Sequence, residues 1–405
     1  AGAWCGQNKY LSAIKNAFQN FMPLTIAGAI GVLWCNVLVN DQTGLGLFFK
    51  PIMALDFLNP AFQAVNFCTI SCITVGITLG IAQEIGVWNM GAERAGYIPG
   101  LVGLAAWLSV TNTSHMVDGA KEAFTGIAGN ELGATGLFTG MIIGVLSVEL
   151  FCFFEKQDAL KIKMPEQVPP GVARAFEVLV PATITLIITA CIGSACYNLT
   201  GLYLNDVIKN GIQGPLGAVG ATIPGVMIIY LVIMLFWLVG IHGNNMLSAV
   251  KEALFTPLAL ENVEAFNKGE TPKNIINMYF LQMCGEFGGS GVTIGLVIAI
   301  MIFGKREDNK AIASLSLVPG LFNINETVTF GIPMVLNPIL GIPFVFACLV
   351  TILVGYVLTV IGFCPVACLT VPWTTPPIVF GFLATGANVM GAVTQAILIV
   401  VSTVI

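Results

Sequence analysis

Pro319-Gly-Leu-Phe-Asn-Ile-Asn-Glu-Thr-Val-Thr-Phe-Gly-Ile-Pro-Met-Val-Leu-Asn-Pro338 carries polar side chains inside a strongly apolar region. We expect Pro319 and Pro333 to prevent a continuous helix here. Glu326 is the last charged residue, because 327–405 contains no Asp, Glu, Lys, Arg or His. A carboxylate inside a bilayer costs about 2.5–3.5 kcal/mol, and irregular backbone at that depth has to be buried or line a wet cavity. The stretch therefore predicts a functional site; the alternative is a loop outside the bilayer with a solvated glutamate.

The composition is that of an all-α polytopic membrane protein. Hydrophobic residues make up 56% of the 405 residues and charged residues 9%, with a mean hydropathy of +0.89; a soluble chain would carry about 25% charged residues. At about 20 apolar residues per crossing, there is room for roughly ten transmembrane helices. The long apolar runs do not alternate, which favours helices over a β-barrel. The net charge of −5 offers no basic surface for nucleic acid.

The eleven cysteines do not predict a disulfide framework. Most lie in or beside apolar runs, where a reduced thiol packs as a small hydrophobic group. Cys364 and Cys368 are four residues apart, but no histidine or acidic residue is near them in the sequence. No phosphate loop or nucleotide fingerprint is present. We therefore expect no metal and no cofactor.

The N-terminal half predicts an amphipathic helix followed by regular spans. Residues 7–20 place Tyr10, Leu11, Ile14 and Phe18 at helical spacing, with polar side chains opposite. Glycines at 136, 140 and 144 form a small-xxx-small run, which we use to favour this half for self-association. The expected spans are 21–39, 61–82, 97–110, 133–154, 176–197 and 216–241.

The basic residues predict the orientation. Residues 155–174 carry four of them in a short loop, which indicates the cytoplasmic side and puts the N-terminus there too. The cluster at 305–310 also looks cytoplasmic, so 242–285 has to supply an extra crossing. Glycine and proline interrupt that region, and we expect re-entrant segments near 242–260 and 311–334, the usual sign of a transporter's binding site.

A second polar constellation closes an apolar run at Trp237-Leu-Val-Gly-Ile-His-Gly-Asn-Asn245. His242 should therefore reach a membrane-buried or interfacial position, whereas His115 in a polar loop is given no role. Histidine, glutamate and carboxamides suit a polyhydroxyl ligand, because each is a directional donor or acceptor. Trp237 and Trp373 could stack on a sugar ring, or else belong to an interfacial belt. The candidate binding residues are His242, Glu326, Asn244, Asn245, Asn323, Asn325, Trp237 and Trp373.

Two of these stretches carry a family resemblance. Gly240-Ile-His-Gly-Asn-Asn245, and Pro319 to Glu326 followed by Phe330-Gly-Ile-Pro333, resemble the signature regions of enzyme IIC of the lactose/cellobiose/diacetylchitobiose family of sugar phosphotransferase systems. Gln7 to Ile14 is similar too, and the resemblance covers essentially the whole chain. Within the family, the chain looks most like the members that carry N,N′-diacetylchitobiose, with cellobiose transporters the near neighbours. The family commonly has proline after the glutamate, where this chain has Thr327.

The resemblance implies a homodimer of ten-span protomers with two re-entrant hairpins, in the cytoplasmic (inner) membrane of a bacterium. Residues 1–215 would form the dimer, and residues 216–405 would bind and move the disaccharide. The sugar would be phosphorylated at its 6-hydroxyl by a phosphocysteine on the separate cytoplasmic enzyme IIB. Glu326 and His242 are then the catalytic pair at that hydroxyl, with Glu326 the better base, although the sequence does not exclude the reverse.

A proton-coupled secondary sugar transporter is the alternative, in which Glu326 and His242 would form a proton relay. A pore is a third possibility, but nothing resembles a filter motif. A neighbouring gene for a small cysteine-containing cytoplasmic protein would favour the phosphotransferase interpretation.

Overall fold

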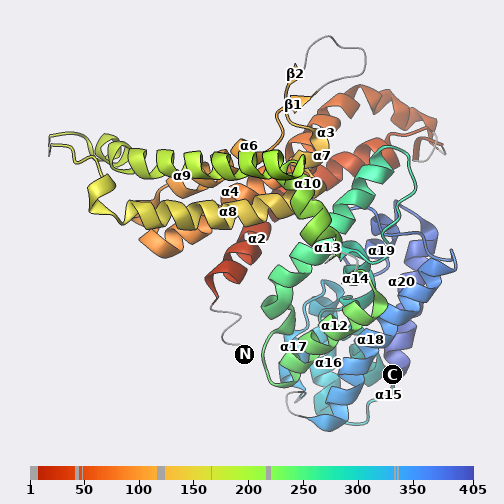
Figure 1. Cartoon of the computed structure of the whole chain (residues 1–405). Coiled ribbons are helices and arrows are strands. Elements are labelled where there is room, and N and C mark those ends of the chain that lie inside the picture. Colours follow the sequence, from red (N-terminus) through yellow and green to blue (C-terminus); the bar gives the residue numbers. More distant parts are fainter. Residues whose placement is uncertain are drawn as a thin grey trace. The chain divides into compact units, whose positions relative to one another are not determined.

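The chain folds into two compact units in a computed structural model (Figure 1), described here over 8–41, 45–47, 49–115, 124–165, 167–215, 220–332, 334 and 337–405. The N-terminal unit contains Gln7–Pro23 and Thr69–Pro215. The C-terminal unit contains Leu24–Cys68 and Leu216–Ile405. A single cut of the chain does not separate the units, because Leu24–Cys68 belongs with the C-terminal residues. Gln7, Pro333 and 216–219, used in the sequence predictions, lie outside the described residues.

Helices that pack side by side build the N-terminal unit: α4 (Ile73–Met90), α6 (Ile98–Val110), α8 (Ala134–Glu155) and α9 (Pro170–Thr200) (Figure 1). Their core includes the buried side chains of Ala106, Trp107, Val110 and Ile143.

The glycine run of α8 is used inside this unit. A Cβ atom at Gly140 would collide with the Thr78 hydroxyl of α4, and one at Gly144 would lie 3.1 Å from the Thr78 carbonyl oxygen. The glycines therefore allow α8 to approach α4 within one chain. The expected self-association of this half stays a prediction.

The N-terminal helix is longer than expected. Helix α2 (Lys9–Leu33) runs through Pro23 into the π-helical segment η1 (Trp34–Leu38), so the amphipathic helix and the first span are one element.

The smaller elements before residue 216 are η2 (Leu45–Leu47), η3 (Lys50–Leu58), α3 (Asn59–Asn66), η4 (Phe67–Ser71), α5 (Ala92–Ala95), β1 (Ser114–His115), β2 (Phe124–Thr125), α7 (Gly129–Leu132), η5 (Asp158–Leu160), α10 (Leu204–Ile208) and η6 (Lys209–Gln213). Strands β1 and β2 pair antiparallel, with Ser114 opposite Thr125.

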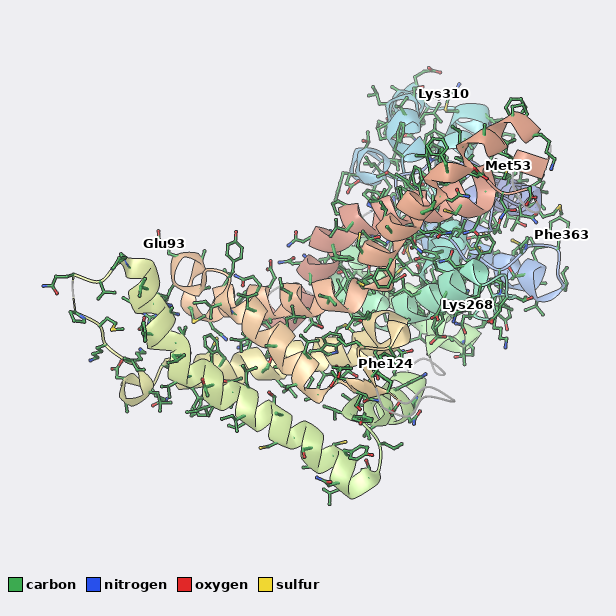
Figure 2. The ribbon with its side chains drawn as sticks, turned by 90° about the horizontal axis from the view of Figure 1, so that it is seen from above. Met53, Glu93, Phe124, Lys268, Lys310 and Phe363 are labelled. Carbon is green, nitrogen blue, oxygen red and sulfur yellow. The ribbon has the colours of Figure 1, made fainter. Side chains whose placement is uncertain are left out.

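The C-terminal unit is also helical, and α18 packs against α12, α14 and α20. Lys268, just beyond α13, and Lys310 in α16 lie at opposite ends of this unit (Figure 2). Its helices after residue 216 are α12 (Ile223–Leu238), α13 (Gly243–Asn267), α14 (Met278–Gly285), α15 (Ile294–Phe303), α16 (Glu307–Leu321), α17 (Glu326–Gly331), α18 (Pro338–Val360), α19 (Val379–Ala384) and α20 (Val389–Val404).

Pro257 does not interrupt the chain as expected, because it lies inside α13. A proline removes one backbone hydrogen bond, and the packing of α13 against α12 and α14 offsets that loss. The stretch that begins at Pro319 is not one continuous helix, as expected: α16 ends at Leu321 and α17 begins at Glu326. Asn323, whose φ of +62° is left-handed, lies between the two helices.

Four helical stretches in the described residues are long and apolar enough to cross a membrane: Lys9–Leu38, Ala134–Glu155, Pro170–Thr200 and Ile339–Val360. Lys50–Ser71 and Ile73–Met90 together form a broken fifth candidate. Four further apolar helices have 10–17 residues, fewer than the about 20 that a straight crossing needs. The ten-span count therefore stays a prediction. The ten cysteines within the described ranges are free thiols, as the sequence indicated.

Candidate functional site

His242 stands at the sharp connection between α12 and α13. Gly240 has a φ of +78°, and a side chain at Gly243 would collide with the carbonyl oxygen of Ile233, so both positions need glycine. His242 is the N-cap of α13, and its Nδ1 accepts a hydrogen bond from the backbone N–H of Asn245 at 3.3 Å. The cap fixes the imidazole at the start of the helix.

The opposite edge of the imidazole faces Glu326. His242 Nε2 lies 3.8 Å from Glu326 Oε1, and the two side chains are 33% and 48% exposed. Because Nδ1 accepts a hydrogen bond, the neutral ring carries its proton on Nε2, on the side of the carboxylate. A separation of 3.8 Å exceeds a hydrogen bond. Both groups therefore keep capacity for a ligand, one as donor and one as acceptor.

Glu326 begins α17, and Asn325 before it anchors this end of the helix. Asn325 is 3% exposed. Its Nδ2 donates to the Ser290 carbonyl at 2.9 Å and to the Thr329 hydroxyl at 3.1 Å. Both donor hydrogens are therefore used inside the protein, so Asn325 orients the backbone next to Glu326.

Asn323 ties three segments together. Its Oδ1 accepts from the Gly288 N–H at 2.6 Å, and its Nδ2 donates to the carbonyls of Trp373 at 2.5 Å and Thr375 at 3.0 Å. This side chain joins the polar stretch to the irregular segment 361–378. Trp373 is thereby held near this region with 43% of its surface exposed.

Asn244 and Asn245 have different surroundings. Asn244 Nδ2 donates to the Ser290 hydroxyl at 2.8 Å, and its Oδ1 accepts from Lys251 Nζ at 3.1 Å. Asn245 is exposed, and its backbone supplies the N–H that His242 accepts. Asn245 therefore offers a carboxamide at the surface of the site, whereas Asn244 is bonded within the protein.

Trp237 and Trp373 also differ. Trp237 is 1% exposed, and its ring centre lies 4.4 Å from that of His242 and 6.2 Å from that of Phe330. It packs behind the imidazole and limits its movement. Trp373, by contrast, is partly exposed.

The sequence reasoning missed the turn from Glu286 to Thr293, which lies between the two polar constellations. Gly288, Gly289 and Gly291 have φ values of +72°, +93° and +80°. A Cβ atom at Gly289 would lie 2.6 Å from the Asn325 side chain. Glycine is therefore required for both the conformation and the close approach.

Glu286, Lys251 and Tyr230 were missed as well, although they bond to one another inside the unit. Two sequence signals could have found Glu286 and Lys251. Glu286 directly precedes Phe-Gly-Gly-Ser-Gly, and Lys251 follows Asn244 by two helical turns.

Helices that are long and apolar enough to cross a membrane, together with a polar site inside the C-terminal unit, define the class of this chain, a polytopic membrane transporter. The chain belongs to the phosphotransferase system EIIC family, whose model matches residues 15–348. This confirms the family predicted from the two signature stretches.

Three similar proteins align with this chain over nearly its whole length. The chain is 34% identical over 395 residues to the oligo-β-mannoside-specific EIIC component of Bacillus subtilis, covering 96% of this chain and 86% of that one. It is 29% identical over 459 residues to the cellobiose-specific EIIC component of Lactococcus lactis, covering 99% and 93%. The crystal structure of ChbC, the IIC component from the N,N′-diacetylchitobiose-specific phosphotransferase system, has a TM-score of 0.90 at 29% identity, covering 99% and 93%. The fold is therefore that of an EIIC transporter.

Proposed function

We propose that this EIIC protein imports a disaccharide, N,N′-diacetylchitobiose or cellobiose, and presents its 6-hydroxyl to phospho-enzyme IIB. The observation that carries the proposal is the pairing of His242 and Glu326, 3.8 Å apart and both partly exposed. A hydroxyl between them can donate to the carboxylate and accept from the imidazole.

In the reaction, the hydroxyl oxygen attacks the phosphorus of the enzyme IIB phosphocysteine. The new O–P bond forms as the S–P bond breaks, and the cysteine leaves as a thiolate. Glu326 takes the hydroxyl proton, and the Nε2–H of His242 holds the oxygen in line. The chain contributes positioning and a proton acceptor, which are the contributions that phosphoryl transfer requires of a protein.

In this proposal the sugar rings lie against Trp373, which is partly exposed, and the Asn245 carboxamide supplies a polar contact. Trp237, Asn323 and Asn325 act indirectly in this proposal, because their bonds and packing are made within the protein. The choice of N,N′-diacetylchitobiose rests on the similarity to ChbC. Relatives named for cellobiose and oligo-β-mannosides make those sugars the comparison set.

The functional unit that we propose is a homodimer of ten-span protomers with a cytoplasmic N-terminus, in which 1–215 dimerise and 216–405 carry the sugar. Re-entrant segments near 242–260 and 311–334 belong to the same proposal. Single cysteines at Leu160 and Asp308, in a background without other reactive thiols, should resist an impermeant thiol reagent added to whole cells. Labelling at 308 but not at 160 would overturn this topology.

Proteoliposomes test the proposed activity. We expect counterflow exchange of N,N′-diacetylchitobiose without an energy source, and no concentration under an imposed proton gradient. Sugar phosphate should appear only with phospho-enzyme IIB on the inner face. A proton symporter would instead use the membrane potential, worth about 2.3 kcal/mol per charge per 100 mV, and deliver unmodified sugar. Accumulation of unmodified sugar that a protonophore abolishes would replace our proposal with the symporter.

A further inference from the structure

A buried ion pair joins α13 to the glycine-rich turn. The ammonium of Lys251 contacts the carboxylate of Glu286, and their side chains are 7% and 17% exposed. Tyr230, which is 1% exposed, donates its hydroxyl hydrogen to Glu286 Oε1 at 2.7 Å. The Lys251 nitrogen lies 5.5 Å from the centre of the Tyr230 ring. Helices α12 and α13 and the end of α14 thus meet at one carboxylate.

Hydrogen bonds lead from this pair to both parts of the site. Lys251 Nζ donates to Asn244 Oδ1, and Asn244 Nδ2 donates to the Ser290 hydroxyl. The Ser290 carbonyl in turn accepts from Asn325 Nδ2. Asn244 is two residues from His242, and Asn325 is next to Glu326. The route therefore ends beside each member of the proposed catalytic pair.

Stability alone does not account for this arrangement. Burying two charges costs desolvation energy, and well-packed apolar side chains are often as stabilising as a buried ion pair. The pair does, however, set the orientation of the Asn244 amide. Lys251 requires the oxygen of the Asn244 amide, which directs the amide nitrogen to Ser290. The Ser290 turn is thus held against α13 on one side and Asn325 on the other.

We propose that Lys251 and Glu286 are positioning residues that hold the turn Phe287–Thr293 and thereby set the separation of His242 and Glu326. The inference rests on the proposed function and adds two residues to it. Neither residue touches the reacting atoms. Their loss should displace the reacting hydroxyl, and a displacement of about 1 Å costs on the order of 100-fold in rate.

The experiment compares Lys251→Met, Glu286→Gln and the double variant with the wild type. Each single change leaves one buried charge unpaired and should lower both the melting temperature and the kcat for sugar phosphorylation. The double variant removes both charges and should regain most of the melting temperature. Its kcat should stay at least about tenfold low, while the Kd for the sugar changes by less than about threefold.

Two further variants complete the test. Tyr230→Phe removes one hydrogen bond to Glu286 and leaves the ion pair, so it should fold and lose kcat by about three- to tenfold. Lys268→Met breaks an exposed pair with Glu264 beyond the other end of α13 and should leave kcat unchanged.

The outcomes separate the two proposals. A double variant with wild-type kcat would show that the pair only balances charge, and would overturn the inference. Wild-type kcat in both single variants, or in Tyr230→Phe, would overturn it as well. If the wild type itself does not phosphorylate sugar with phospho-enzyme IIB, the proposed function fails first.

Discussion

His242 Nε2 lies 3.8 Å from Glu326 Oε1, while the Nδ1 of the same ring accepts from the backbone of Asn245. The ring is thus fixed by one nitrogen and faces the carboxylate with the other. A separation of 3.8 Å is too long for a direct hydrogen bond, whereas a hydroxyl that bridges the two groups could bond to both. The spacing therefore suits a bound alcohol better than a closed ion pair.

Glu326→Gln tests the carboxylate. The amide keeps the size and one acceptor oxygen but cannot take a proton as a base, so phosphorylation should collapse. Sugar binding should weaken about tenfold or more through the lost charge-assisted hydrogen bond. Phosphorylation assays with phospho-enzyme IIB and calorimetric titration measure the two effects. Glu307→Gln, at an exposed glutamate that begins α16, is the control; wild-type rates in Glu326→Gln rule out the base role.

His242→Asn separates capping from the site role. Asparagine is a good N-cap, so the start of α13 should persist and the melting temperature should change little. The Nε2–H that faces Glu326 is lost, and kcat should fall on the order of 100-fold. His242→Ala should lose the cap as well, about 1 kcal/mol of stability. Equal kcat in His242→Asn and the wild type would assign the histidine to capping alone.

Glu155 tests the ion-pair network at one end of the N-terminal unit. Its carboxylate, 3% exposed, bonds to Arg94 at 2.7 Å and Arg174 at 2.9 Å, and both arginines also reach Glu177. Breaking a buried pair leaves a charge uncompensated, but Arg94 is 46% exposed, so water partly compensates its charge. We therefore expect Glu155→Gln to lower the free energy of unfolding by about 2–3 kcal/mol. Thermal unfolding measures the loss.

Asp158→Asn is the matched control for Glu155→Gln. Lys161 lowers the pKa of the Asp158 carboxyl, but this carboxylate is solvent-exposed, so the variant should unfold at the wild-type temperature. Equal melting temperatures for Glu155→Gln and Asp158→Asn would show that the network does not stabilise the unit.

Glu131 should make stability depend on pH. Burial raises the pKa of its carboxyl; His115 opposes and Asp206 adds to this shift. Glu131 Oε2 has no hydrogen-bond partner within the described ranges. The pKa of Glu131 is thus higher in the folded protein than in the unfolded protein. Below about pH 4, near the unfolded-state pKa, the side chain is protonated and its burial does not lower stability. As the pH rises through the folded-state pKa, the buried carboxylate becomes charged and this stability is lost.

Glu131→Gln should therefore raise the melting temperature near pH 8 and leave it unchanged near pH 4, as followed by thermal unfolding in detergent. Glu93→Gln is the control, because Glu93 is exposed. It lies at the opposite end of the same unit from Phe124, which is seven residues before Glu131 in the sequence (Figure 2). An identical response of both variants would contradict the role given to burial.

The sequence alone determined the class, the family and the residues most worth testing. Hydropathy and charge act through local composition, so the membrane class, the expectation of free thiols and most of the apolar helices followed from the order of residues. Polar residues in apolar runs are costly, and this made His242 and Glu326 conspicuous before any geometry was known.

Tertiary structure decided which distant residues meet. Pro257 stays helical because α12 and α14 pack against α13, and a local rule has no access to those neighbours. Lys251 and Glu286 find each other only after folding brings α13 against the glycine-rich turn. Two buried charges can be stable together and costly apart, and only the three-dimensional arrangement determines which of these holds.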